Sequence, residues 1–211
     1  FVSGQLITFE GSEGCGKTTQ IAMLAKRLEA QGKTVRITRE PGGTLIGEKI
    51  RSLLQDPINT GEISPTTELL LFSAARAELI EQLIKPALER GEIVICDRFY
   101  DSTFVYQGIA RSIDLEVINQ LKTIAVGSLK PNLTILLDLD AEVGIKRAEE
   151  RQSGTLDRIE AESLEFFKSV RQAYLDLAKH QTDRFTVING ELSVEAIEAI
   201  VWSNVERKLL N

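Results

Sequence analysis

The sequence predicts an α/β fold in which a five-stranded parallel sheet lies between two layers of helices. Short apolar runs alternate with segments of helical periodicity, and glycine or proline marks most of the boundaries. In addition, 43% of the 211 residues are hydrophobic, which is enough for one sizeable core. Such alternation is typical of a parallel sheet covered on both faces. We therefore expect a single domain over residues 1–211.

The expected strands are apolar runs that recur along the whole chain. They occupy residues 6–9, 35–38, 93–96, 133–137 and 185–188. A glycine-rich loop follows the first run, and the helix after it places Ile21, Leu24 and Leu28 on one face before Gly32 ends it. Because ligands of such folds gather at the carboxyl ends of the strands, functional side chains should follow these runs.

The longest expected helix opens at Pro65, with Ser64 as its cap, and runs toward residue 90. Pro86 should kink its last turn, and Gly91 should end it. The remaining helices are expected at residues 45–54, from Asp114 onward, at 164–179 and at 194–209.

Composition excludes several classes of protein. The chain has 25 Lys and Arg against 31 Asp and Glu, and this net charge of −6 argues against nucleic acid as a partner. No apolar run reaches membrane-spanning length, so a membrane partner is not expected. Cys15 and Cys96 are too few for a disulfide framework, and no secretory signal pattern opens the sequence. We therefore expect a cytoplasmic protein.

The segment from Gly11 to Thr18, Gly-x-x-x-x-Gly-Lys-Thr, matches the phosphate-cradling loop. Its glycines let backbone N–H groups turn toward phosphates, and the following helix adds its positive N-terminal end. Lys17 should bridge the outer phosphates of the nucleotide, and the Thr18 hydroxyl should hold Mg²⁺. The residues expected to bind the nucleotide are Gly11, Ser12, Glu13, Gly14, Cys15, Gly16, Lys17, Thr18 and Thr19.

A carboxylate on the magnesium side is expected at the end of a neighbouring strand. Asp97 and Asp138 both end apolar runs and compete for this role. Because Arg98 directly follows Asp97, we expect Asp97 rather than Asp138 to be the carboxylate on the magnesium side. A capping carboxylate is the structural alternative.

Arginines also follow the strands, at positions 39, 98, 151 and 158. Guanidinium groups bind phosphate bidentately, and four arginines at the same edge of the sheet are more than the phosphates of one nucleotide need. A second phosphorylated ligand is therefore expected, although any one of them could be a surface charge. An anionic phosphate acceptor needs no general base, and His180, the only histidine, lies inside a predicted helix and is expected to be structural.

At this point the sequence resembles the bacterial type of thymidylate kinase over nearly its whole length. The matching segments, in family order, are FEGSEGCGKTT, TREPGGT, ELLLFSAARAE, DRFYDSTFVYQG, LLDLD and LDRIE. The resemblance implies the three-layer fold of P-loop nucleotide kinases, with a small mobile lid at about residues 147–160. It also implies transfer of the ATP γ-phosphate to dTMP, with Mg²⁺, in a homodimer.

The resemblance assigns roles to individual residues. Glu13 should face the 3′-hydroxyl of the acceptor, and Arg39 and Arg98 should hold its phosphate. The residues expected around the thymine and the sugar are Phe72, Arg76, Thr103, Tyr106 and Gln107. Phe72 should stack on the base, and Arg76, which can only donate, should bond its carbonyl edge. Alternatively, Phe72 and Tyr106 could be core residues, and Arg76 could pair with Glu78 or Glu81.

The phosphate loop contains no basic residue between Gly11 and Gly16 that could reach the transferred phosphoryl group. The segment KRAEERQSGTLDR supplies such residues instead. Our hypothesis is that Arg151 neutralises that group and that Arg158 also contacts phosphate, which makes Lys17, Arg98, Arg151, Glu13 and Arg158 the expected catalytic residues. The alternative for the lid is a helix with Glu–Arg pairs. A deoxynucleoside kinase or a nucleotide-dependent regulatory protein are the alternative functions.

Overall fold

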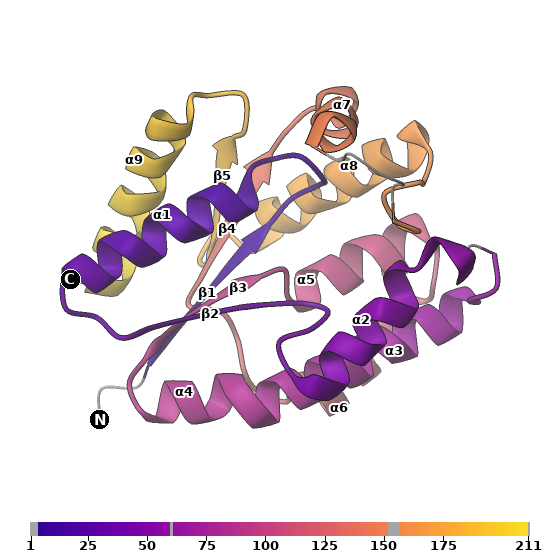
Figure 1. The fold of residues 1–211 in the computed structure, drawn as a ribbon, viewed down its shortest axis with the longest axis horizontal. Coiled ribbons are helices and arrows are strands. Elements are labelled where there is room, and N and C mark those ends of the chain that lie inside the picture. The colour runs from indigo at the N-terminus through magenta and orange to yellow at the C-terminus, as the bar shows by residue number, and fades with distance from the viewer. Residues whose placement is uncertain (1–3, 60, 152–156, 211) are drawn as a thin grey trace.

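The computed structural model describes residues 4–59, 61–151 and 157–210, including the backbone but not the side chain of residue 151. Its centre is one sheet in the order β2-β3-β1-β4-β5 (Figure 1). The strands are β1 Gln5–Glu10, β2 Val35–Arg39, β3 Ile93–Asp97, β4 Leu133–Asp138 and β5 Phe185–Asn189. Every pairing is parallel. The expected sheet is confirmed, with each strand end within one residue of the prediction.

Helices fill the intervals between the strands. They are α1 Lys17–Ala30, α2 Leu45–Gln55, α3 Pro65–Leu79, α4 Lys85–Glu89, α5 Tyr100–Thr103, α6 Leu115–Val126, α7 Ala141–Arg151, α8 Leu164–His180 and α9 Val194–Val205. Several of them begin with a side-chain cap that accepts a bond from a backbone N–H two or three residues on; these caps include Thr44, Ser64, Asp114, Ser163 and Ser193. No helix of the described ranges is long and apolar enough to cross a bilayer.

The two faces of the sheet carry different helices (Figure 1). On one face, Leu24 of α1 and Trp202 of α9 pack against Ile7 and Phe9 of β1. On the other face, α3, α4 and α6 cover β3, and Tyr174 of α8 covers β4. Successive side chains of a strand point to opposite faces of the sheet, so each strand contributes to the hydrophobic core on both faces. This layering leaves the carboxyl edge of the sheet open.

Two helical segments differ from the sequence prediction. The long helix from Pro65 is interrupted by a π-helical turn, Ile80–Ile84, before α4. This interruption lies upstream of Pro86, which has no N–H to continue the hydrogen-bond ladder. α5 and the π-helical segment Phe104–Ala110 were not predicted from the sequence. Of the expected lid, residues 152–156 lie outside the described residues.

Candidate active site

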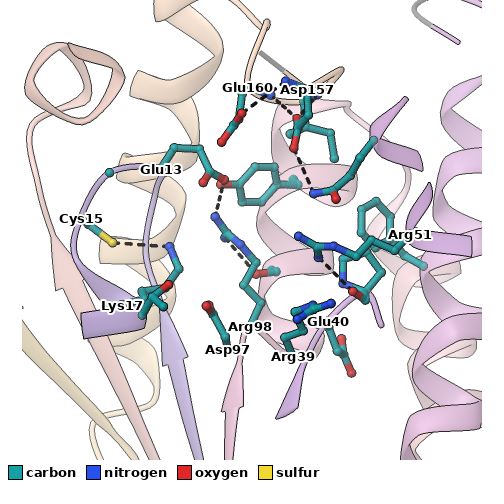
Figure 2. Close-up of a pocket in the computed structure, with 18 of the residues that line it drawn as sticks. Glu13, Cys15, Lys17, Arg39, Glu40, Arg51, Asp97, Arg98, Asp157 and Glu160 are labelled. Carbon is teal, nitrogen blue, oxygen red and sulfur yellow. Dashed lines mark hydrogen bonds and ion pairs between the residues drawn. The ribbon is translucent and has the colours of Figure 1, made fainter. Parts of the chain in front are cut away.

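A cavity of about 720 Å³ opens at the carboxyl edge of the sheet (Figure 2), a volume typical of ligand sites. The predicted site residues that line it are Glu13, Gly14, Cys15, Gly16, Lys17, Thr18, Thr19, Arg39, Phe72, Asp97, Arg98, Thr103, Tyr106 and Gln107. Gly11, Ser12, Arg76 and Arg158 are buried behind its surface. The register explains the grouping, because Asp97 lies opposite Phe9 of β1 and Arg39 of β2.

The phosphate loop has the backbone that its glycines permit. Gly14 has φ +69°, and a Cβ there would overlap the carbonyl oxygen of Gly144 in α7. Gly16, with φ +94°, forms the N-cap of α1. The loop therefore packs against α7 and directs the start of α1 at the cavity.

Lys17 is held by the loop itself. Its Nζ donates to the carbonyl oxygens of Gly11 at 3.0 Å and Ser12 at 2.9 Å, and it lies 3.5 Å from Cys15 Sγ (Figure 2). Thr18 and Thr19 are exposed to the cavity in the first turn of α1. The ammonium and the helix N-terminus thus form a positive end suited to phosphates.

Asp97 fits the magnesium-side carboxylate better than Asp138. Within the described residues, the buried Oδ1 of Asp97 accepts no hydrogen bond. Asp138 is instead occupied, since both its oxygens accept from Arg171, at 2.7 and 3.1 Å. A buried oxygen without a donor at the end of β3, in the same cavity as the Thr18 hydroxyl, is a suitable partner for a hydrated cation.

Arg98 lies at the middle of the cavity. Its Nη2 bonds Glu13 Oε1 at 2.5 Å (Figure 2), and its guanidinium stacks 5.1 Å from the ring centre of Tyr106. Its φ of +67° is unusual for a residue with a side chain, and its N–H donates to the carbonyl oxygen of Phe9. This backbone turns the side chain from the strand end into the cavity.

A buried carboxylate beneath Arg98 was not predicted from the sequence. Glu10, at the end of β1, is fully buried and accepts bonds from the Phe99 N–H and from the hydroxyls of Ser102 and Tyr174, at 2.7–2.8 Å. Those two hydroxyls lie 3.4 Å from Arg98 Nη1. Burial and then the nearby Asp101 raise the pKa of Glu10 to about 7, against the opposing influence of Arg98.

Two further arginines form a basic wall beside Arg98. Arg39 is half-exposed and bonds both oxygens of Glu48, at 3.1 and 2.9 Å. Arg51 of α2, which sequence reasoning missed, donates to the carbonyl oxygen of Pro41 and lines the cavity. Burial and the neighbouring Arg39 lower the pKa of Arg51, which indicates two guanidinium groups close together. Such a pair suits an anionic ligand.

The other end of the cavity is suited to a flat ring. Phe72 is only half-buried there, so it is not a core residue. Tyr106 is buried with its ring edge-on to Tyr174, and burial raises the pKa of its hydroxyl. Thr103 and Gln107 complete this end.

Arg76 lies behind this end rather than on its surface. Its Nε donates to Glu40 Oε2 at 2.7 Å and its Nη2 to Thr103 Oγ1 at 2.8 Å. The alternative pairing with Glu78 or Glu81 is therefore wrong. The second oxygen of Glu40 is buried and, among the described contacts, accepts no bond.

The basic residues around the lid are placed differently from one another. Arg147 of α7 lines the cavity and donates to the carbonyl oxygen of Gly190 at 3.2 Å. Arg158 faces away from the cavity: it is 6% exposed and bonds Leu54 O at 2.8 Å and Glu68 Oε2 at 2.5 Å. The structure does not bring Arg158 to the phosphate loop, because this network holds it against α2 and α3. The side chain of Arg151 lies outside the described residues.

Known proteins resemble this chain over almost its full length. The thymidylate kinase family model matches residues 9–201. A thymidylate kinase of Pelobacter propionicus is 50% identical, covering 99% of this chain and 97% of the relative. One from Deinococcus radiodurans is 46% identical, covering 97% of this chain and 98% of the relative.

A solved structure agrees with these relatives. The crystal structure of thymidylate kinase from Ehrlichia chaffeensis superposes with a TM-score of 0.77 at 35% identity, and the match covers 96% of this chain and 99% of that one. Fold, loop geometry and sequence likeness therefore agree, and the chain belongs to the thymidylate kinase family.

Proposed function

We propose that the chain transfers the γ-phosphoryl group of ATP to the phosphate of dTMP, giving ADP and dTDP. The observation that carries this proposal is a single cavity with two anion-binding walls. The phosphate loop with Lys17 forms one wall, and Arg39, Arg51 and Arg98 form the other. The relatives' names support dTMP as the acceptor, and the half-buried Phe72 at the far end suits a base.

The reaction needs positioning and charge neutralisation rather than a base, because the attacking phosphate oxygen is already anionic. Lys17 would hold the outer phosphates of ATP, and Arg98 would orient the acceptor phosphate. Glu13, bonded to Arg98, would face the 3′-hydroxyl of the sugar. Tyr106 would crowd the position of a ribose 2′-hydroxyl.

Thr18 and Asp97 are the residues that would hold Mg²⁺. The cation, when bound, neutralises charge on the phosphates. The chain supplies one hydroxyl and one carboxylate, and the substrates' phosphates and water supply the remaining ligands, as is usual for Mg²⁺.

Arg151 is our candidate for neutralising the transferring phosphoryl group. The spacing along α7 supports this assignment, because residues four apart lie on the same face of a helix and Arg147, four residues earlier, lines the cavity. Replacing Arg151 by Ala should lower kcat by about 10³, the usual effect of removing such an arginine. Single-turnover rates measure this, and an unchanged kcat would reject the assignment.

We further propose that the enzyme is a homodimer that works in the cytoplasm. Exposed apolar side chains gather on three helices: Leu53 of α2, Leu70 of α3, and Val117 and Ile124 of α6. These helices lie side by side (Figure 1), since α3 contacts both others. Apolar faces of this kind are typical of subunit interfaces. Free thiols at Cys15 and Cys96 suit a reducing compartment.

A panel of nucleoside monophosphates, each with ATP and Mg²⁺, tests the activity. Coupled detection of ADP should give the highest kcat/KM with dTMP. Arg98→Ala should lower that value at least about 100-fold, because the guanidinium would hold the acceptor in the transition state. Turnover with thymidine but not dTMP would instead indicate the nucleoside kinase, and no turnover with any acceptor would indicate a regulatory protein.

A further inference from the structure

Glu68 is a buried carboxylate in the first turn of α3 that accepts hydrogen bonds from three side chains in two distant parts of the chain. It is 2% exposed. Its Oε1 accepts from Gln107 Nε2 at 2.8 Å, and its Oε2 accepts from Arg158 Nη2 at 2.5 Å. Arg111 approaches the same carboxylate at 3.3 and 3.4 Å. Of these groups, only Gln107 also lines the cavity.

The two arginines determine which hydrogen-bonding role Glu68 can take. Burial alone would raise the pKa of Glu68, but its bonds from Gln107 and Arg158 and the charge of Arg111 hold that pKa below its usual value. Glu68 is therefore ionised, and an ionised carboxylate can only accept hydrogen bonds.

An acceptor-only partner fixes the orientation of a glutamine amide. The side-chain amide of Gln107 must direct its NH₂ group at Glu68, which leaves its carbonyl oxygen on the other side of the amide. Gln107 lines the cavity together with Phe72 and Thr103, so its carbonyl oxygen is the amide atom that remains for a ligand there.

We propose that Glu68 is a positioning residue that sets base specificity by holding Gln107 as a hydrogen-bond acceptor. This inference rests on the proposed function, in which a pyrimidine base occupies this end. Thymine and uracil carry an N–H at ring position 3, which Gln107 can bind. Cytosine carries a bare nitrogen acceptor there, so two acceptors would face each other. Glu68 thus favours thymine and uracil over cytosine, and Arg158 contributes by keeping Glu68 ionised.

The test is Glu68→Gln, assayed with dTMP, dUMP and dCMP. A glutamine at position 68 can donate to Gln107 and so allows its amide to flip, which turns a donor toward the base. The ratio of kcat/KM for dTMP over dCMP should fall by about 10-fold or more. The ratio for dTMP over dUMP should stay unchanged, because both bases present the same N–H. General loosening of the pocket would change both ratios.

The same measurements on Gln107→Met and on Glu68→Gln/Gln107→Met complete a double-mutant cycle. Once the amide of Gln107 is removed, Glu68→Gln should no longer change the ratio of kcat/KM for dTMP over dCMP. Glu81→Gln, an exposed carboxylate beyond α3, is the matched control and should change neither ratio. Because Glu68→Gln leaves Arg158 buried without its partner, Glu68→Gln/Arg158→Met repeats the test if the single variant does not fold.

Two results would overturn the proposal. One is a folded Glu68→Gln variant in which the ratio of kcat/KM for dTMP over dCMP is unchanged. The other is an effect of Glu68→Gln on this ratio that is equally large with Gln107 and with Gln107→Met. Failure of the proposed function is distinguishable, because the wild-type chain would then not turn over dTMP at all.

Discussion

Asp97 and Asp138 end neighbouring apolar runs and look equivalent in the sequence, yet their surroundings separate them. Arg171, from a helix more than thirty residues downstream, neutralises Asp138, while Asp97 keeps a buried oxygen without a donor among the described residues. Such pairings join residues distant in sequence, so no local pattern predicts them. The same reason explains why sequence reasoning missed Glu10, Arg51 and Glu68, whereas Lys17 and Thr18 followed from a contiguous motif.

Asp97→Asn should raise the Mg²⁺ concentration for half-maximal rate by about 10-fold or more, because a neutral amide binds the cation more weakly than a carboxylate. Asp138→Asn is the matched control, and its Mg²⁺ requirement should stay at the wild-type value. Rates measured over a Mg²⁺ titration at saturating ATP check both. If Asp138→Asn raised the requirement and Asp97→Asn did not, the assignment would be reversed.

Glu10 should make stability depend on pH. Its pKa is about 7 in the folded chain, against 4.5 for the ordinary group. Between these values the folded chain holds a proton that the unfolded chain has released, so the free energy of unfolding falls as pH rises through this window. The difference is about 3 kcal/mol in total.

Urea unfolding of wild type and Glu10→Gln at pH 5 and pH 8 measures this effect. Wild type should lose more stability than the variant between the two values. Glu40, whose pKa burial also raises, is present in both chains and cancels in the comparison. Equal losses in the two chains would show that Glu10 does not titrate in this range.

At the scale of elements, all five strands were predictable. β1, β3, β4 and β5 are short, mostly apolar runs that end at a polar residue, and β2 alternates the apolar Val35 and Ile37 with polar residues. Helices with capping residues, such as α3 and α6, were predictable for the same local reason. The segment from Tyr100 to Ala110 was not, because it changes from α-helix to π-helix after one turn and so has no steady period. Tyr106 and Gln107 lie on that segment, and only the family resemblance pointed to them.

The phosphate loop and α7 meet at Gly14, which gives a test of this contact. Gly14→Ala should weaken binding of an ATP analogue by about 10-fold or more, since its Cβ would displace the loop from Gly144. Gly127→Ala is the control, because Gly127 also has a positive φ, +64°, but open space around it. That variant should lose some stability and keep its affinity. Calorimetric titration and thermal unfolding separate the two outcomes, and equal affinities would refute the contact.

At the scale of the whole molecule, the sequence indicated one domain but not which helix faces remain uncovered. That information comes from the layering, which leaves Leu70 50% and Ile124 81% exposed on neighbouring helices. If these side chains form the subunit interface, Leu70→Glu should convert the dimer to a monomer at micromolar concentration, because it would bury a charge.

Sedimentation velocity measures this change. Val194→Glu, on α9 at the opposite face of the sheet, should leave the association state unchanged. A monomeric wild-type chain at all concentrations would contradict the proposed dimer.

The bond between Glu13 and Arg98 has a consequence for turnover. The carboxylate of Glu13, from the phosphate loop, bonds the Arg98 guanidinium that we assign to the acceptor phosphate. Glu13 therefore competes with that phosphate for Arg98. This competition lowers the affinity for the monophosphate and the diphosphate alike, and it favours release of the diphosphate product after phosphoryl transfer.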